Sequence, residues 1–164
     1  MRRRALRIVL LGLLAIGCAH GQPAPPASAP SPPTSAEVEG AVRGAVEQYR
    51  QAYEVRSLEA LAPLYVQTDE LRVTDQGRTL VGWTAVAADL AHTLSVNTEV
   101  KLRVTDLQIL ALGDGGAVAT VRARRSLGDG SHVVDENGTL TLVFRRQAGS
   151  FLILSEHWSF AGAP

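Results

Sequence analysis

Apolar residues recur at three- and four-residue steps after the first 34 residues, and this spacing predicts an amphipathic helix from about Ser35 to Glu54. The segment Thr34–Glu37 has the capping-box pattern that marks a helix start, with Ser/Thr followed three residues later by Glu. Ser57 can cap a short second helix, which Pro63 limits. A third apolar stripe, beginning at Trp83, predicts a third helix.

Alternating apolar and polar residues, separated by Gly- and Asp-rich turns, predict a series of strands in the rest of the domain. The predicted strands are residues 71–74, 79–81, 98–112, 117–127, 139–146 and 151–160. The alternation changes phase near Thr105 and Asp106, which is what a β-bulge would produce, and bulges bend sheets. The predicted elements follow in the order helices, hairpin, helix and meander. This order predicts an α+β fold, with helices on one side of a bent, mostly antiparallel sheet.

The last predicted strand, residues 151–160, carries apolar side chains on both faces, which is typical of a central strand. Strict alternation places His157 and Ser159 on one face, and we expect that face to point inward. There His157 could act as a general base or donate to a bound carbonyl. The alternative is a structural histidine. Its neighbour Glu156 should point to the opposite face, so the two cannot form one acid–base pair.

The N-terminus has the organisation of a secretory signal peptide over residues 1–17, with four arginines followed by an apolar run too short to span a bilayer. The placement of Cys18 directly after a small residue resembles a bacterial lipobox, although Ala15 stands where Leu is usual. That resemblance implies cleavage before Cys18 and lipidation of its thiol. The alternative is an ordinary cleaved signal. Residues 18–34 then form a Pro/Ala/Ser-rich tether to a domain over residues 35–161.

Charge and cysteine content exclude several classes of protein. Residues 1–17 contain four arginines and no acid, which leaves 12 basic and 16 acidic residues and a net charge of −4 for the remainder. A mildly acidic domain argues against nucleic acid as a partner. Cys18 is the only cysteine, so no intramolecular disulfide or Cys-based zinc site can form. The histidines lack metal-ligand spacing, and we expect neither metal nor cofactor.

The element order, the pair Gly82-Trp83 that opens the third helix, and the segment Ser155-Glu156-His157-Trp158-Ser159 resemble the NTF2-like superfamily, in its SnoaL-like or DUF4440-type branch. The resemblance covers residues 35–160. It implies a cone-shaped fold, in which a curved sheet wraps around helices and leaves a pocket, and a homodimer packed through the sheet. The superfamily contains isomerases, dehydratases, cyclases and members without known chemistry, so the fold alone assigns no function.

Further candidates for a ligand pocket are aromatic and hydroxyl side chains that join His157 and Ser159. They are Tyr49, Tyr53, Tyr65, Trp83 and Thr141. The aromatic members suit a small apolar or aromatic molecule, and core filling is the alternative for each. Isomerases of the superfamily use an inward carboxylate as base. The acids near the first hairpin, Asp69, Glu70 and Asp75, have no clearly apolar surroundings, which weakens the isomerase interpretation.

Arginines cluster on two strands that should pair, at positions 122, 124, 125, 145 and 146. They could form an anion-binding strip or a dimer contact. We favour a solvated sheet face with weak ion pairs.

Taken together, these features favour a lipid-anchored cell-envelope domain that binds a small, largely apolar molecule, or acts as an accessory binding module, without catalysis. In a Gram-negative host it would face the periplasm from the outer membrane. One alternative is an isomerase, dehydratase or cyclase with His157 as acid or base and Tyr49 or Tyr53 as hydrogen-bond donor. The other is a purely structural dimerisation domain.

Overall fold

The computed structural model describes residues 32–160, so the expected signal peptide, Cys18 and most of the tether lie outside the described residues. Within that range the helices are α1 (Ser35–Glu54), α2 (Leu58–Leu61), the 3-10 turn η1 (Ala62–Leu64) and α3 (Trp83–Val96). The strands are β1 (Arg72–Asp75), β2 (Arg78–Val81), β3 (Glu99–Ala111), β4 (Gly116–Gly128), β5 (Val133–Gln147) and β6 (Ser150–Phe160). None of these helices is long and apolar enough to cross a membrane.

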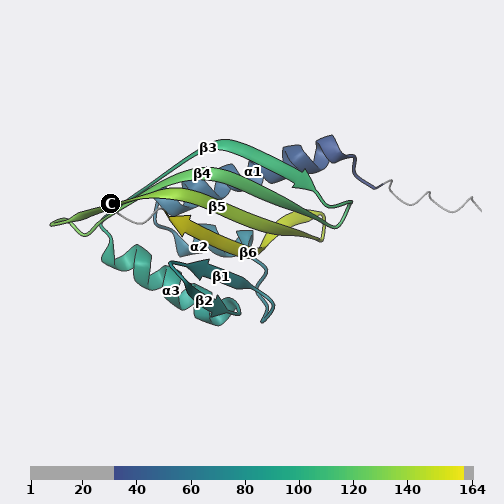
Figure 1. Ribbon diagram of the computed structural model, residues 1–164. Coiled ribbons are helices and arrows are strands. Elements are labelled where there is room, and N and C mark those ends of the chain that lie inside the picture. Colours follow the sequence, from purple (N-terminus) through teal and green to yellow (C-terminus); the bar gives the residue numbers. More distant parts are fainter. Residues whose placement is uncertain (1–31, 161–164) are drawn as a thin grey trace, which may run out of the picture. The chain divides into compact units, whose positions relative to one another are not determined.

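The described strands form one curved sheet of six strands in the order β2-β1-β6-β5-β4-β3, with α1 and α3 against its inner side (Figure 1). Neighbouring strands are antiparallel except β1 and β6, which pair in parallel. The predicted α+β fold is therefore confirmed, and so is the central place of the last strand. β5 begins at Val133, earlier than the expected Thr139, because it pairs with β4 along the whole of that strand.

Two predicted local features are present. The Thr34 side chain accepts from the Glu37 backbone N–H at 3.3 Å, and the Glu37 carboxylate accepts from the Thr34 N–H at 2.7 Å, which completes the capping box of α1. In β3 the pairing register with β4 shifts between Thr105 and Gln108, and Asp106 has a φ of +53°. This is the predicted bulge, and it keeps apolar side chains inward on both sides of the bend.

A second bulge lies in β6. Val143 of β5 pairs with Ser155, whereas the next residue, Phe144, pairs with Ile153, so Leu154 is an extra residue on β6. Before it, Phe151 and Ile153 are buried, and after it the buried positions are Glu156 and Trp158. The face that β6 turns inward therefore changes parity at Leu154.

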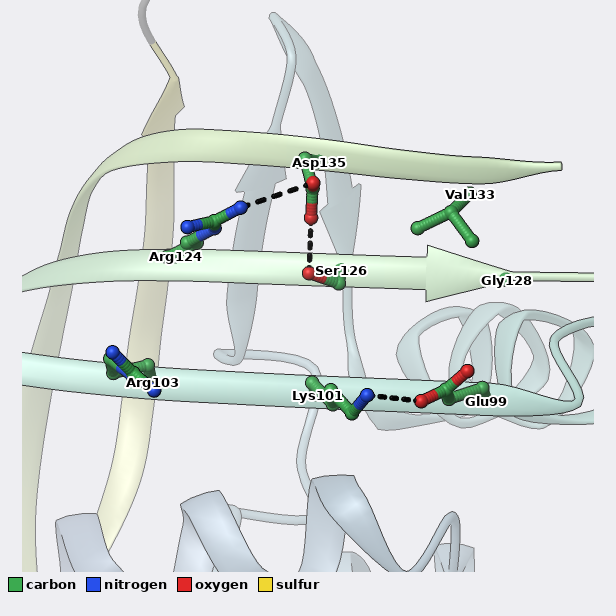
Figure 2. Close-up of a pocket in the computed structure, with 8 residues that line it drawn as sticks. All are labelled: Glu99, Lys101, Arg103, Arg124, Ser126, Gly128, Val133 and Asp135. Atoms are coloured by element: carbon green, nitrogen blue, oxygen red, sulfur yellow. Dashed lines mark hydrogen bonds and ion pairs between the residues drawn. The ribbon is translucent and has the colours of Figure 1, made fainter.

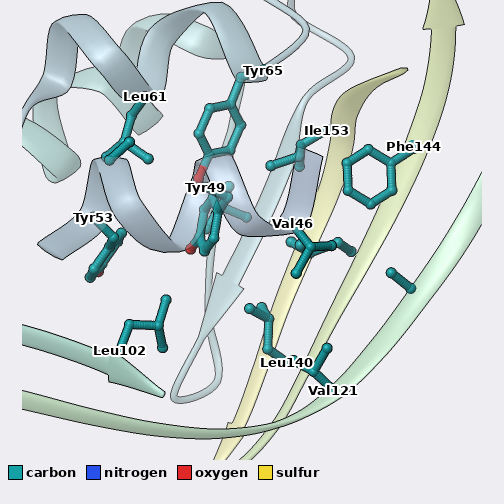
Figure 3. Close-up of a cluster of buried hydrophobic side chains, with 14 of the residues drawn as sticks. Val46, Tyr49, Tyr53, Leu61, Tyr65, Leu102, Val121, Leu140, Phe144 and Ile153 are labelled. Atoms are coloured by element: carbon teal, nitrogen blue, oxygen red, sulfur yellow. The ribbon is translucent and has the colours of Figure 1, made fainter. Parts of the chain in front are cut away.

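The core fills the space between α1 and the inner face of the sheet (Figure 3). Its aromatic centre is formed by Tyr49 and Tyr53 of α1 with Tyr65, which follows η1; the Tyr49 ring lies 5.7 Å from that of Tyr53 and 6.3 Å from that of Tyr65. Aliphatic side chains from the strands, such as Leu102 and Leu140, close it. The aromatic hydroxyls thus lie in the interior, where each needs a partner.

Candidate functional site

The interior holds a carboxyl group, that of Glu156, which is 2 % exposed. Three side chains donate to it: the Tyr49 hydroxyl at 2.9 Å, the Tyr65 hydroxyl at 2.5 Å and the Trp158 indole N–H at 2.5 Å. Burial raises the pKa of Glu156 above its ordinary value, and the three donors oppose that rise. The two tyrosines have pKa values raised well above normal, first by burial and then by Glu156, so they remain protonated donors.

A buried cation lies beside this carboxyl group. Arg125 of β4 is 4 % exposed, and its guanidinium donates from Nε to Glu136 at 2.7 Å and from Nη2 to Asp75 at 2.9 Å. The same group lies 4.7 Å from the ring centroids of both Trp158 and Phe160, which stack on each other at 5.3 Å. Two carboxylates and two aromatic rings thus hold Arg125 in one place.

A cavity of about 100 Å³ opens between α3, the β1–β2 hairpin and the C-terminal halves of β4 and β6. Its polar lining consists of Tyr53, Asp75, Arg78, Asp89, Thr93, Arg125 and Glu156, and its apolar lining of Val73, Leu80, Leu90, Leu127 and Trp158. Arg78 and Asp89 pair with each other at 2.6 Å and are the more exposed members. A polar floor with apolar walls is the usual composition of a small-molecule site.

Asp75 has a property that sets it apart within this lining. Its Oδ2 accepts from Arg125, but its Oδ1 is buried and has no hydrogen-bond partner among residues 32–160. Beside it, burial raises the pKa of Tyr53 to about 12, although the nearby Arg125 lowers it, so the hydroxyl keeps its proton. A buried polar atom without a partner costs folding free energy, and a ligand or water that reached Oδ1 would remove that cost.

The size of the cavity limits what it can hold. An apolar cavity of about 150 Å³ accommodates benzene, which has six non-hydrogen atoms, so this smaller cavity accepts a molecule of about four non-hydrogen atoms, or a few waters. Asp75 could accept a hydrogen bond from such a molecule, or a proton in a reaction. Tyr53 could donate to a carbonyl or hydroxyl oxygen.

The structure places several sequence-predicted residues away from the cavity. His157 and Ser159 are exposed on the outer face of the sheet, so the expectation that they point inward is wrong. The physical reason is the extra residue Leu154, which reverses the parity of the strand beyond it. Thr141 pairs with His157 across β5 and β6 and lies on the same outer face.

The aromatic candidates divide into two groups. Tyr53 lines the cavity. Tyr49 and Tyr65 hold Glu156 instead, and Trp83 is partly buried with its ring 5.8 Å from that of Tyr65. Three of the four therefore serve the core and the Glu156 cluster rather than the cavity wall.

The residues that sequence reasoning passed over are Asp75, Arg125 and Glu156. Arg125 shares the parity of the buried Val121 and Ala123, a signal that would have placed it inward rather than on a solvated face. Glu156 stands alone as an acid in an apolar strand. For Asp75 no local signal exists, because its partner Arg125 is distant in sequence. Within the described part of the chain no cluster of side chains has the composition of a metal site.

Comparisons with known proteins agree with this geometry. Residues 42–163 match the SnoaL-like domain family. Among solved structures, a member of the NTF2-like family from Streptomyces avermitilis, provisionally named a dehydratase, is 22% identical, with a TM-score of 0.72 over 79% of this chain and 100% of that chain. A protein from Novosphingobium aromaticivorans, provisionally named a scytalone dehydratase, is 12% identical, with a TM-score of 0.68 over 76% and 84%.

A third structure, an NTF2-like protein of unknown function from Pseudomonas putida, is 25% identical, with a TM-score of 0.65 over 76% of this chain and 87% of that chain. No curated protein matches the chain. Since the family match covers most of the sequence, this chain belongs to the SnoaL-like domain family, with an NTF2-like fold.

Proposed function

We propose that this protein is a cell-envelope lipoprotein whose SnoaL-like domain binds a small molecule in the cavity between α3 and the sheet. The observation that carries the proposal is that Asp75, a residue of the cavity lining, has a buried Oδ1 without a hydrogen-bond partner in the described range. A folded protein rarely leaves a buried carboxylate oxygen without a partner unless something else supplies one. A hydroxyl, amine or amide N–H on the ligand would supply it.

A second candidate function is proton transfer, as in a dehydratase or isomerase. The observation that favours it is the placement of a carboxylate, Asp75, and a protonated hydroxyl, Tyr53, on the same small cavity. Asp75 would take a proton from the bound molecule while Tyr53 donates to an oxygen of it. The provisional names of two structural neighbours agree with this class of reaction. Asp75 takes the role for which His157 was expected.

The test compares the wild-type domain with Asp75→Asn by native mass spectrometry and by titration of any molecule found bound. We expect the wild type to carry a small adduct and Asp75→Asn to bind it at least tenfold more weakly, because the side chain at position 75 of the cavity lining then has no negative charge. The matched control is His157→Ala, which alters a side chain on the outer face and should bind as the wild type does.

Equal binding by wild type and Asp75→Asn would contradict the proposal. Conversion of the bound molecule by the wild type, abolished in Asp75→Asn and in Tyr53→Phe, would favour the enzyme. The same spectra report the homodimer that the family resemblance implies, which stays a prediction.

The lipid anchor is tested separately at Cys18. We expect the full-length protein, expressed with its signal peptide in a bacterial host, to enter the detergent phase on phase separation, because a lipidated N-terminus adds a large apolar group. Cys18→Ser should remain in the aqueous phase. The control Ala19→Ser leaves the acceptor cysteine in place, and identical partitioning of the Cys18→Ser and wild-type proteins would overturn the anchor.

A further inference from the structure

The outer face of the sheet, opposite the cavity, carries a concentration of positive charge. Arg103 of β3 and Arg124 of β4 are directly opposite each other in the strand pairing, and Arg122 lies two residues along β4 on the same face. Like charges directly opposite each other on neighbouring strands are destabilising. A nearby negative charge relieves this repulsion.

The described residues supply only part of that counter-charge. Arg124 reaches Asp135 at 3.2 Å, and Arg122 approaches Asp106 at 3.5 Å, with both arginines more than half exposed. Arg103 forms no ion pair with any residue of the described range. In Figure 2 it extends from β3 without a partner, whereas Lys101, on the same strand, forms an ion pair with Glu99. Exposed pairs of this kind contribute little, so the guanidinium groups remain available.

A shallow hollow of about 440 Å³ lies over these arginines. Its lining includes all three guanidinium-bearing residues, the amide of Asn137, and the hydroxyls of Thr105 and Thr139, and no acidic residue. The three arginines, with an amide and two hydroxyls, offer more hydrogen-bond donors than the two oxygens of a carboxylate can accept. A phosphate group, with three or four acceptor oxygens and up to two negative charges, fits this set better.

We propose that this hollow on the outer sheet face is an anion site that binds the phosphate group of a soluble phosphorylated molecule. The site is separate from the cavity, because the polar side chains of β3, β4 and β5 that line the hollow lie on the outer face of the sheet and the cavity lies on the inner side. The hollow is larger than a phosphate group alone requires, which leaves room for an organic part. Its lining has no large apolar side chain of the kind that inserts into a lipid surface.

The experiment titrates inorganic phosphate, at constant ionic strength and pH 7, into the full chain in non-ionic detergent. Binding is followed by the NMR signals of the arginine Nε–H groups. We expect saturable shifts for Arg103, Arg122 and Arg124, and at least tenfold weaker binding for Arg103→Gln. The control Arg43→Gln removes the same charge from the exposed surface of α1 and should bind as the wild type does.

Folding is monitored in the same samples. Because Arg103→Gln relieves repulsion from Arg124, its melting temperature should equal or exceed that of the wild type, which separates loss of binding from loss of structure. Shifts that do not saturate, or an affinity that Arg103→Gln leaves unchanged, would overturn the proposal. The homodimer packed through the sheet that the family resemblance implies would use this same outer face. A dimer by light scattering whose arginine signals do not respond to phosphate would therefore also overturn the proposal, since a second copy would occupy the hollow.

Discussion

Replacing Glu156 by alanine is expected to lower the free energy of unfolding by about 3–5 kcal/mol. The substitution leaves the hydroxyls of Tyr49 and Tyr65 and the indole N–H of Trp158 without their acceptor in the interior. Each buried donor that loses its partner costs about 1–3 kcal/mol, and water entering the space left by the side chain recovers part of that. Urea unfolding followed by tryptophan fluorescence measures the change.

The neighbouring position provides the control. His157 is adjacent in sequence but exposed, so His157→Ala should change the free energy of unfolding by about 0.5 kcal/mol or less. Equal effects of the two alanine substitutions would mean that β6 does not turn Glu156 inward.

Comparison with a more conservative variant, Glu156→Gln, tests how the contribution of Glu156 to stability depends on pH. Burial raises the pKa of Glu156 above its ordinary value of 4.5, so the folded state binds the proton more tightly than the unfolded state. The contribution that this tighter proton binding makes to the free energy of unfolding is therefore complete below about pH 4.5. It is lost as the pH rises through the folded-state pKa of Glu156. The stability of the wild type relative to Glu156→Gln should fall over that interval, by up to about 1.4 kcal/mol per pH unit. A difference that rises with pH would contradict the assignment.

Replacing Arg125 by alanine should cost about 3–5 kcal/mol as well, for a different reason. It removes the cation that lies between Asp75 and Glu136. The Glu136 carboxylate, whose side chain is 10% exposed, then has no cationic partner and keeps only the hydrogen bond from the Gln76 amide. Removing one member of a buried ion pair is far more destabilising than removing an exposed pair. It also removes the contact with the stacked rings of Trp158 and Phe160.

Arg124→Ala is the matched control, since it removes the same side chain one residue earlier in β4. Arg124 is exposed, and its loss should change stability by about 1 kcal/mol or less. Arg125→Lys should fall between the two, because it keeps the charge but cannot donate to both carboxylates with the geometry of a guanidinium. Chemical denaturation of the three variants tests the order, and a cost for Arg124→Ala equal to that for Arg125→Ala would contradict it.

The fold could be predicted from the sequence because local signals agreed with one another. The capping box at Thr34, the apolar stripe of α1 and the phase change at Asp106 each depend on residues close together in the chain, and each is present. The central place of β6 followed from its apolar character on both faces.

The site could not be predicted to the same extent, for two physical reasons. A strand that is apolar on both faces gives no clue to where an extra residue is accommodated, and the bulge at Leu154 decides whether Glu156 or His157 points inward. The second reason is that Asp75 meets Arg125 only through the assembled sheet. Among the aromatic candidates, Tyr53 lines the cavity. The hydroxyls of Tyr49 and Tyr65 instead donate to Glu156, which strict alternation had placed on the outer face.

The central position of β6 also affects the order in which the parts of the domain can fold. β6 joins the β1–β2 hairpin to the β3–β4–β5 meander, and its parallel pairing with β1 connects parts of the domain made early and late in synthesis. Until β6 emerges, the hairpin and the meander each have an unpaired edge, and Glu156 and Trp158 are missing from the interior. Such late, long-range pairing slows folding. A chain that ends before residue 150 lacks the strand that joins the hairpin to the meander, so we expect it to form neither the six-stranded sheet nor the cavity.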